Sequence, residues 1–427
     1  MKYSVLRMKI EEKTVKTLIR QGGPSVFSWS EIYLNPYQGC YHNCMYCDGK
    51  SEHYHMHEDF GDRIFVKENA PALFKKFLRS KGFQPVHNKE QSAIDEFFPS
   101  LKEIPDSKTH PKSIITIGGG VCDVYQQPEK TVKMTRELLE IVYDYQFPLW
   151  LLTKNDLVLR DIDLIKEINK ESYACVNFTI TLNDEKAQKI FEPRASTTTE
   201  RFEAIRILRK AGIHSGVFCY PSLPFIGNTD ENIQAIYQRA KEVDAEFIYA
   251  NGLTLKPGRN KDEFMRTVKQ HYPDFHPKYE LLYGNNNKYG QLDMEQTQKL
   301  GHIWSLHRGY KFGYELGLDY TAKRFVPEGR IKTNLLLAEL LWRIVYLKGS
   351  ILYEPRYEVN AFNEAAKLAE NSKRDFGKLK EDEFSDIPTN NQVREVIKAF
   401  VKTGKSDYLV ALEKKSYDHL VDKYYSK

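Results

Sequence analysis

The feature that most constrains the fold is a regular alternation of two kinds of segment between residues 113 and 250. Short apolar runs alternate with longer segments in which apolar residues recur at the spacing of an amphipathic helix. This order predicts βαβ units whose right-handed crossovers curl a parallel sheet into a barrel. We therefore expect an α/β fold with a partial (β/α)6 barrel of the TIM type. The predicted strands are 31–35, 113–117, 148–152, 174–180, 214–220 and 246–250, and the predicted helices between them are 129–145, 161–169, 200–211 and 230–243.

The alternation stops near Tyr272, and this change suggests three regions. Residues 1–30 form an N-terminal extension, residues 31–272 the barrel, and residues 273–427 a mainly helical C-terminal region. Within the last region, residues 333–348 are predicted to form a buried helix. We expect this region either to cover the mouth of the barrel or to bind substrate.

Composition limits the class of protein without naming a partner. The chain has 427 residues, of which 41% are hydrophobic and 28% are charged, as in globular proteins with a buried core. The net charge of +5 permits an anionic partner but does not indicate one. Residues 1–20 lack the apolar segment of a signal peptide, and the most apolar stretch, 335–347, is too short to cross a bilayer. We expect a cytoplasmic protein that does not bind membranes.

Three of the six cysteines lie within eight positions. They are Cys40, Cys44 and Cys47, in the spacing C-x3-C-x2-C. Crowded cysteines in a chain without an export signal indicate metal or cluster ligation and not disulfides. Three thiolates on one tight loop can hold three irons of a cubane cluster, and no fourth cysteine lies nearby. One iron would then be open to a small molecule.

Two other interpretations of this motif stay open. A structural zinc ion wants four ligands, and His42 or His53 could supply the fourth. The three thiols could also be unrelated. The context favours the cluster, because the motif directly follows a predicted strand and Tyr46 precedes the third cysteine. Cys175 and Cys219 lie in apolar predicted strands and are expected in the core.

Further motifs follow the cysteines in a fixed order. They are Asn35–Cys40, Tyr46–Glu52, Gly118–Gln126, Leu152–Lys154, Leu157–Asp161, Phe191–Pro193 and the strand end at Pro221. With the C-x3-C-x-aromatic-C signature, this order resembles the radical S-adenosylmethionine (SAM) superfamily. Within it, the chain is most similar to the spore photoproduct lyase-like family, whose members are also described as DNA repair photolyase-like.

The resemblance implies two cofactors and a reaction. Cys40, Cys44 and Cys47 would bind three irons of a [4Fe–4S] cluster, and the amino and carboxylate groups of SAM would chelate the fourth. Reductive cleavage of SAM would then give a 5′-deoxyadenosyl radical that takes a hydrogen atom from the substrate. The resemblance also implies an electron donor such as flavodoxin or ferredoxin, and lyase-like chemistry on an unidentified substrate, with DNA or another nucleic acid as the family's suggestion.

Several residues are candidates for binding SAM. Lys154 ends a predicted strand, where the active sites of barrels lie, and the matching lysine of the family contacts the methionyl carboxylate. The alternative is a solvated lysine at a strand end. Gly118, Gly119 and Gly120 end another strand, and backbone without side chains can approach the methionyl ammonium closely. The alternative for these three is a simple turn.

Three more candidates rest on the resemblance. Thr179 matches a serine of the family lyase and is expected to bond the ribose or carboxylate of SAM, while Tyr46 is expected to pack on the adenine. Either could instead be an ordinary residue of the core. The family lyase uses a cysteine near the glycine strand end as a hydrogen-atom donor, but the matching position here is Gly120. Cys122, two residues on, is the candidate donor, or else a small buried thiol.

A second class of function remains open from the sequence. The chain could be a non-catalytic nucleic-acid-binding protein that zinc or a cluster stabilises. Gly120 stands where the family lyase has its hydrogen-donor cysteine, and this difference argues against the particular repair reaction of that lyase. The C-terminal region shows no helix-turn-helix or zinc-finger signature.

Overall fold

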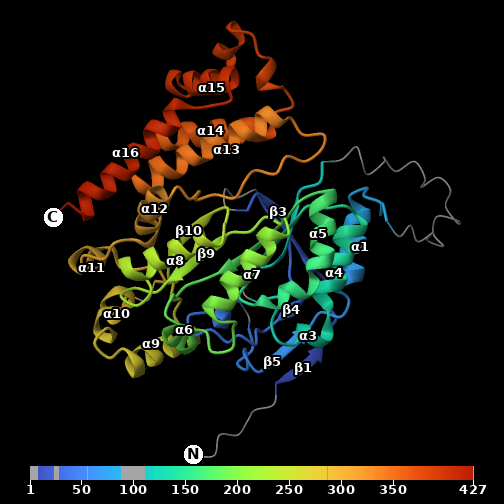
Figure 1. Cartoon of the computed structure of the whole chain (residues 1–427), viewed down its shortest axis with the longest axis vertical. Coiled ribbons are helices and arrows are strands. Elements are labelled where there is room, and N and C mark those ends of the chain that lie inside the picture. Colours follow the sequence, from blue (N-terminus) through green and yellow to red (C-terminus); the bar gives the residue numbers. More distant parts are fainter. Residues whose placement is uncertain are drawn as a thin grey trace, which may run out of the picture. The chain divides into compact units, whose positions relative to one another are not determined.

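A seven-stranded sheet forms the centre of the computed structural model (Figure 1). The structure describes residues 8–23, 28–54, 56–87, 111–120, 122–285 and 287–426. The strands of this sheet are β2 (Ile19–Gln21), β3 (Ser30–Leu34), β6 (Ile114–Gly118), β7 (Leu149–Thr153), β8 (Ala174–Thr179), β9 (Val217–Ser222) and β10 (Ile248–Gly252). Their order is β10-β9-β8-β7-β6-β3-β2. All pairs from β10 to β3 are parallel, and β2 pairs antiparallel with β3 at the edge.

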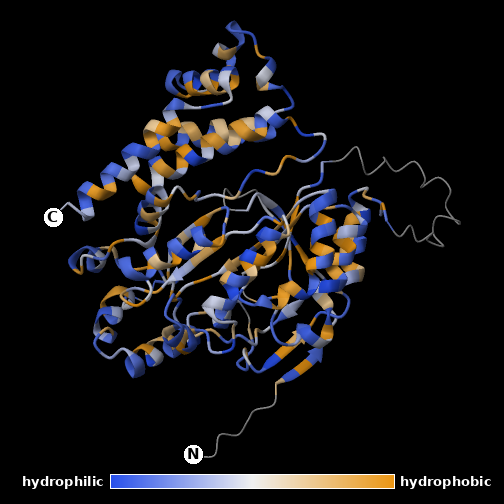
Figure 2. Ribbon diagram, viewed as in Figure 1, coloured by the Kyte–Doolittle hydropathy of each residue, from blue (hydrophilic) through white to orange (hydrophobic). Residues whose placement is uncertain are grey.

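The six parallel strands confirm the predicted α/β fold with a partial (β/α)6 barrel. β6 and β8 are buried along their whole length, as apolar strands between a barrel interior and a helical layer should be. Figure 2 shows both hydrophobic and hydrophilic residues on the helices beside the sheet, as expected for amphipathic helices. The helices between the strands include α4 (Met134–Asp144), α5 (Ile162–Glu171), α7 (Thr198–Lys210) and α8 (Asp230–Glu242).

Two of these helices, α7 and α8, begin at a side-chain cap. α7 starts with a capping box, in which the Thr197 side chain accepts from the Glu200 N–H and the Glu200 carboxylate accepts from the Thr197 N–H. Thr229 caps α8 by accepting from the Asn232 N–H. Such caps fix where each helix leaves the strand before it, and so fix the loops at the carboxyl ends of the strands.

An aromatic cluster fills part of the barrel interior. The rings of Trp150, Phe218 and Phe247 lie with centroids 5.8–6.3 Å apart. Gly216 is required beside them, because a Cβ at this position would meet the Phe247 ring at 2.3 Å. Trp150 lies two residues before Leu152 on β7, so both side chains face the same side of the sheet. The interior is therefore packed below Leu152.

A second, three-stranded sheet supports the segment that follows β3. It has the order β1-β5-β4, from β1 (Lys9–Glu12), β5 (Arg63–Val66) and β4 (Tyr37–Gln38). Next along the chain comes α1 (Ala70–Ser80), which packs on α4. The short 3-10 helices η1 (Asp48–Lys50) and η2 (Glu52–Tyr54) lie between β4 and β5.

The predicted helix 129–145 is broken in the structure. It forms α3 (Glu129–Val132) and α4, because Lys133 between them has a φ of 58°. A left-handed residue ends one helix and lets the next start in a new direction. Three helical segments of this part of the chain were not predicted: η5 (Asp156–Asp161), α6 (Glu185–Phe191) and α9 (Arg259–His271).

The rest of the chain is helical, as predicted for the C-terminal region. Three helices that follow α9 belong to the same compact unit as the barrel: α10 (His276–Tyr283), α11 (Met294–Lys299) and α12 (Ser305–Leu316). A second unit starts at Thr321 and also contains Trp29, whose indole N–H donates to the Ala322 carbonyl at 2.8 Å. Its elements are α13 (Lys332–Tyr346), the π-helical turn η6 (Leu347–Ile351), α14 (Arg356–Asn371), η7 (Phe376–Lys378), η8 (Asp382–Asp386), α15 (Asn391–Thr403) and α16 (Asp407–Tyr424).

The second unit is held together by α13. This helix buries Leu335, Leu337, Leu341 and Ile344 and packs along α14. The predicted helix 333–348 therefore exists with nearly the same bounds. In the described ranges, no helix is both long enough and apolar enough to cross a membrane. The boundary expected near Tyr272 and the role of the C-terminal region stay predictions.

Candidate functional site

The loop after β3 carries the three clustered cysteines into a single cavity. Cys40, Cys44 and Cys47 all line this cavity, which opens at the carboxyl ends of the barrel strands. The Cys40 N–H donates to the Phe60 carbonyl at 3.0 Å, which ties the start of the loop to the segment before β5. Gly39 permits this approach, because it has a φ of 89° and a Cβ there would meet the Arg63 carbonyl at 2.5 Å.

The thiols themselves fit a cluster of several irons. Burial raises the pKa of Cys40 and Cys47, and raises that of Cys44 to about 12. Thiolates in such a place need nearby positive charge, and a bound metal supplies it and deprotonates the thiol. In the part of the chain that the structure describes, no three His, Cys, Asp or Glu side chains are grouped to hold a single metal ion. Three thiols on one loop suit a cubane, in which each thiolate takes a different iron.

The two histidines considered as zinc ligands are placed differently. His42 lines the cavity, but its Nε2 lies 3.2 Å from the Asp123 Oδ2 and its Nδ1 lies 3.3 Å from the Arg194 carbonyl. His53 is exposed in η2, and its Nδ1 lies 3.2 Å from the Ser51 hydroxyl. Neither imidazole is directed at the three thiols.

Most of the other predicted site residues line the same cavity. The lining residues are Cys40, His42, Cys44, Tyr46, Cys47, Phe60, Gly119, Gly120, Cys122, Asp123, Leu152, Thr153, Lys154 and Thr179. Gly118 does not belong to the lining. Its φ is 93°, and a Cβ there would lie 3.0 Å from the Val124 side chain, so it is needed for the turn and its packing. The structure thus brings together all the predicted residues except Gly118.

Lys154 offers a cation to this cavity. Its ammonium lies 5.8 Å from the centroid of the Tyr46 ring, and no hydrogen bond joins it to another residue of the described ranges. Burial alone would lower the pKa of Lys154, but the charges of Cys44 and Glu192 outweigh it and raise the pKa. The side chain is therefore a cation with donors to spare for a bound anion.

A buried ion pair fixes the ring of Tyr46. The Tyr46 hydroxyl donates to the Glu192 carboxylate, which also pairs with the guanidinium of Arg201. Arg201 further donates from Nε to the Ser196 carbonyl at 2.9 Å and from Nη1 to the Thr179 carbonyl at 2.8 Å. Glu192 was noticed in the sequence, but Arg201 was not, because an arginine within an amphipathic helix reads as a surface residue. The pair connects two walls of the cavity.

Arg201→Met is expected to lower the free energy of unfolding by about 3–5 kcal/mol, because it leaves the buried Glu192 carboxylate without its partner. Arg206→Met on the same helix is the control. Arg206 forms an exposed pair with Glu203, so its loss should cost at most about 1 kcal/mol. Urea unfolding of both variants measures the difference, and equal effects would contradict this account of Arg201.

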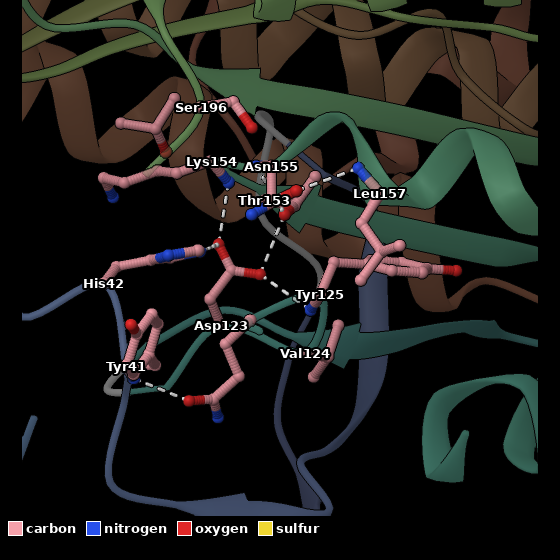
Figure 3. Close-up of polar contacts among 12 residues, drawn as sticks. Tyr41, His42, Asp123, Val124, Tyr125, Thr153, Lys154, Asn155, Leu157 and Ser196 are labelled. Carbon is pink, nitrogen blue, oxygen red and sulfur yellow. Dashed lines mark hydrogen bonds and ion pairs between the residues drawn. The ribbon is translucent and has the colours of Figure 1, made fainter. Parts of the chain in front are cut away.

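A second polar cluster was missed by the sequence argument. Asp123 follows Cys122 in the loop after β6, and its carboxylate meets the end of β7 (Figure 3). It accepts from the Thr153 hydroxyl at 2.8 Å and from the Lys154 N–H at 2.7 Å. Its position inside the Gly118–Gln126 motif was the available signal, but an aspartate in a loop has no distinctive spacing.

Other residues of the shared motifs hold the scaffold. The Gln126 carboxamide accepts from the Tyr41 N–H at 2.6 Å and so anchors the cysteine loop. Glu129, which is fully buried, accepts from the Tyr37 hydroxyl and pairs with Arg160 at 2.7 Å. These side chains explain why the motifs extend beyond the cavity. They connect the cysteine loop to the βα units after β6 and β7.

The segment after Cys47 is fixed from the other side of the barrel. Asp48 accepts from the Thr254 hydroxyl at 3.0 Å and pairs with Lys256, both beyond the end of β10. Lys50 is buried and pairs with Glu263 of α9 at 2.7 Å. The cysteine loop is therefore held by both edges of the open barrel.

Cys122 lies in the cavity wall, whereas the remaining two cysteines do not. The Asn35 side chain donates to the Cys122 carbonyl at 2.7 Å, and burial raises the pKa of the Cys122 thiol to about 12. Cys175 and Cys219 are fully buried in β8 and β9, and neither belongs to the lining. At neutral pH Cys122 is thus a thiol with its S–H bond intact.

Comparisons with known proteins agree with this site. The family model described as the radical SAM superfamily matches residues 34–240. An uncharacterized protein of Methanocaldococcus jannaschii is 28% identical over 261 residues, which are 61% of this chain and 82% of that protein. An uncharacterized protein of Mycobacterium tuberculosis is 24% identical over 254 residues, which are 58% of this chain and 66% of that protein.

Solved structures give weaker similarities. A point mutant of spore photoproduct lyase has a TM-score of 0.48 at 15% identity, over 74% of this chain and 82% of that one. A radical SAM methyltransferase from Kitasatospora setae has a TM-score of 0.35 at 14% identity, over 56% of this chain and 38% of that one. The matched residues 34–240 contain the cysteine loop and most of the barrel, so over this part the chain is similar to the radical SAM superfamily.

Proposed function

We propose that Cys40, Cys44 and Cys47 bind a [4Fe–4S] cluster, and that the protein uses it to cleave SAM reductively in the adjoining cavity. The observation that carries this proposal is the meeting of three thiols, two of them buried, with the Lys154 ammonium in a single cavity, where no hydrogen bond from a described residue engages that ammonium. Thiols suit the irons, and a cation suits the carboxylate of an amino acid. The cavity lies where catalytic groups of barrels converge.

The cofactors supply the chemistry: one electron breaks the S–C5′ bond of SAM, giving methionine and a 5′-deoxyadenosyl radical that takes a hydrogen atom from the substrate. The protein supplies position and charge. Lys154 pairs with the methionyl carboxylate, and the backbone of Gly119 and Gly120 accepts the methionyl ammonium. Thr179 bonds the ribose or carboxylate, and the Tyr46 ring, fixed by Glu192, packs on the adenine.

The carboxylate of Asp123, which lies in the cavity wall, is largely engaged by other residues of the protein. Asp123 accepts from the Tyr125 N–H, the Thr153 hydroxyl and the Lys154 N–H, and its fourth contact is His42 at 3.2 Å. A carboxylate has about four lone-pair sites, and hydrogen bonds use three of those of Asp123. We assign the fourth iron to SAM, with Cys122 as the nearby protein rival.

Anaerobic reconstitution tests the proposal. The protein should take up about four irons per chain and release 5′-deoxyadenosine when it is reduced in the presence of SAM. Dithionite serves as the reductant first, and then a flavodoxin or ferredoxin, the class of electron donor that we propose. A protein that binds a metal ion but releases no deoxyadenosine would be the non-catalytic binder instead.

For the substrate, we propose nucleic acid as the first class to test. The support is the ordered set of motifs shared with spore photoproduct lyase-like proteins, and Gly120 at the donor position argues for a different reaction on it. The test uses deuterium-labelled oligonucleotides and follows the label into 5′-deoxyadenosine. A parallel salt titration of DNA binding separates phosphate contacts from specific recognition, because phosphate contacts weaken steeply with salt.

Cys122→Ala distinguishes the two roles left for this thiol. If Cys122 is the hydrogen-atom donor, the variant should keep its iron and release 5′-deoxyadenosine within about twofold of the wild type, because no ligand is lost. With a deuterium-labelled substrate, label should still reach deoxyadenosine while product formation fails. Loss of iron from this variant would instead make Cys122 a cluster ligand.

A further inference from the structure

Asp123 connects three segments that each carry a different part of the proposed cofactor site (Figure 3). Its own backbone belongs to the loop that presents Gly119, Gly120 and Cys122. Its carboxylate reaches His42, which lies between Cys40 and Cys44 in the cysteine loop. The same carboxylate accepts from two consecutive groups at the end of β7, the Thr153 hydroxyl and the Lys154 N–H.

The contacts to β7 fix the backbone from which the Lys154 side chain departs. The Lys154 N–H is held by the Asp123 Oδ2 at 2.7 Å, and the Lys154 carbonyl accepts from the Ser196 N–H at 3.2 Å. The Thr153 hydroxyl also accepts from the Asn155 N–H at 3.0 Å. Because the N–H and the carbonyl of Lys154 are both hydrogen-bonded, the direction of its Cα–Cβ bond is fixed. No hydrogen bond from a described residue holds its ammonium.

The Asp123 carboxylate is suited to fixing the Lys154 backbone, because it is nearly buried and accepts hydrogen bonds without donating any. Its side chain is 9% exposed, and it accepts hydrogen bonds from two backbone N–H groups and one hydroxyl. Hydrogen bonds to a charged acceptor are stronger than neutral ones. The His42 Nε2 lies 3.2 Å from the Asp123 Oδ2 but is not aligned for a hydrogen bond, so packing holds this side of the cluster.

We propose that Asp123 is a positioning residue that holds Lys154 in register with the cysteine loop, so that SAM meets the cluster and the lysine in one geometry. This inference rests on the proposed function and adds a specific claim: Asp123 acts on SAM through Lys154. It predicts that the two residues are energetically coupled in SAM binding, although the hydrogen bond between them joins the Asp123 carboxylate to the Lys154 backbone and not to its side chain.

The test is a double-mutant cycle with Asp123→Ala and Lys154→Met, scored by the dissociation constant of SAM. Reconstituted protein is used, and equilibrium dialysis gives the constant. Asp123→Ala should raise this constant about tenfold to a hundredfold, the range for losing a bond to a charged group. In the Lys154→Met background the same substitution should change it by less than about twofold, because the residue through which it acts is already gone.

Spectroscopy separates positioning from a structural role. The reduced Asp123→Ala protein should keep the iron content and SAM-free electron paramagnetic resonance (EPR) signal of the wild type, and only the change on adding SAM should be weakened. Asp293→Ala is the matched control, since Asp293 also accepts a backbone N–H, at 3.0 Å from Gln296 at the start of α11, and does not line the cavity. This control should lose stability without any change in SAM affinity.

Thr153→Val keeps the test decisive if Asp123→Ala fails to take up iron. It removes the hydroxyl bond to the carboxylate and should raise the SAM dissociation constant about threefold to tenfold. Unchanged SAM affinity in both variants would overturn the inference, as would full additivity with Lys154→Met. A wild-type protein that binds no SAM would instead overturn the proposed function itself.

Discussion

Replacing Cys40 with alanine is expected to abolish the release of 5′-deoxyadenosine and to lower the iron content of the reconstituted protein. Cys40 is one of the three cavity thiols that lie on a single loop, and the fourth thiol of the lining, Cys122, lies on a different loop. A cubane with only two protein ligands is not retained. Iron analysis, the EPR signal of the reduced protein and chromatography of the products measure the loss. Cys44→Ala and Cys47→Ala should behave in the same way.

Cys175→Ala is the matched control for this series. Cys175 is also a buried cysteine of the barrel, but it lies in β8 and does not line the cavity. The control should keep both the iron and the activity, and lose only the stability expected for a small cavity in the core. A Cys40→Ala protein that released deoxyadenosine at the wild-type rate would remove the basis of the proposed function.

Lys154→Met is expected to raise the dissociation constant of SAM about tenfold to a hundredfold while leaving the cluster in place. The substitution removes the Lys154 ammonium, which has no hydrogen-bond partner in the described residues. The loss of one hydrogen bond to a charged group changes a dissociation constant by about this factor. Methionine keeps the length of the side chain and its packing on Tyr46. Equilibrium dialysis of SAM and iron analysis of the same samples measure the two properties.

Lys170→Met serves as the control for the lost charge. Lys170 lies on α5, with its side chain 76% exposed, and its removal changes the net charge of the protein by the same amount. It should leave SAM binding unchanged. If both lysine variants bound SAM as the wild type does, the carboxylate of SAM would have to be held elsewhere.

The barrel could be predicted from the sequence because parallel strands buried on both faces read as continuous apolar runs. Even so, the predicted strand 214–220 starts three residues before β9, because His214 forms only an isolated bridge with Cys175. The break at Lys133 was missed because a left-handed lysine has no signature in the apolar periodicity. α6 has only seven residues, too few for that periodicity to show.

The candidate site could likewise be predicted only in part. The cysteines could be found because their close spacing directly indicates ligation of a metal or cluster. Lys154 could be found because it follows a predicted strand, and the active sites of barrels lie at the carboxyl ends of strands. His42 and Asp123 could not be assigned, since their contacts join residues that lie far apart in the chain. Arg201 could not be assigned because an arginine within an amphipathic helix reads as a surface residue. The three-stranded sheet β1-β5-β4 was missed for the same reason: its strands have at most four residues and pair out of sequence order.

The central claim is that one iron of the cluster is left open by the protein and is taken by SAM. Electron–nuclear double resonance of the reduced wild-type protein tests it directly, with SAM labelled with ¹⁷O in the carboxylate and ¹⁵N in the amino group. The account predicts hyperfine coupling of both labels to the cluster, in the wild type and in Cys122→Ala alike. Absence of coupling in a protein that has taken up all its iron and binds SAM would show that a protein atom occupies the fourth iron.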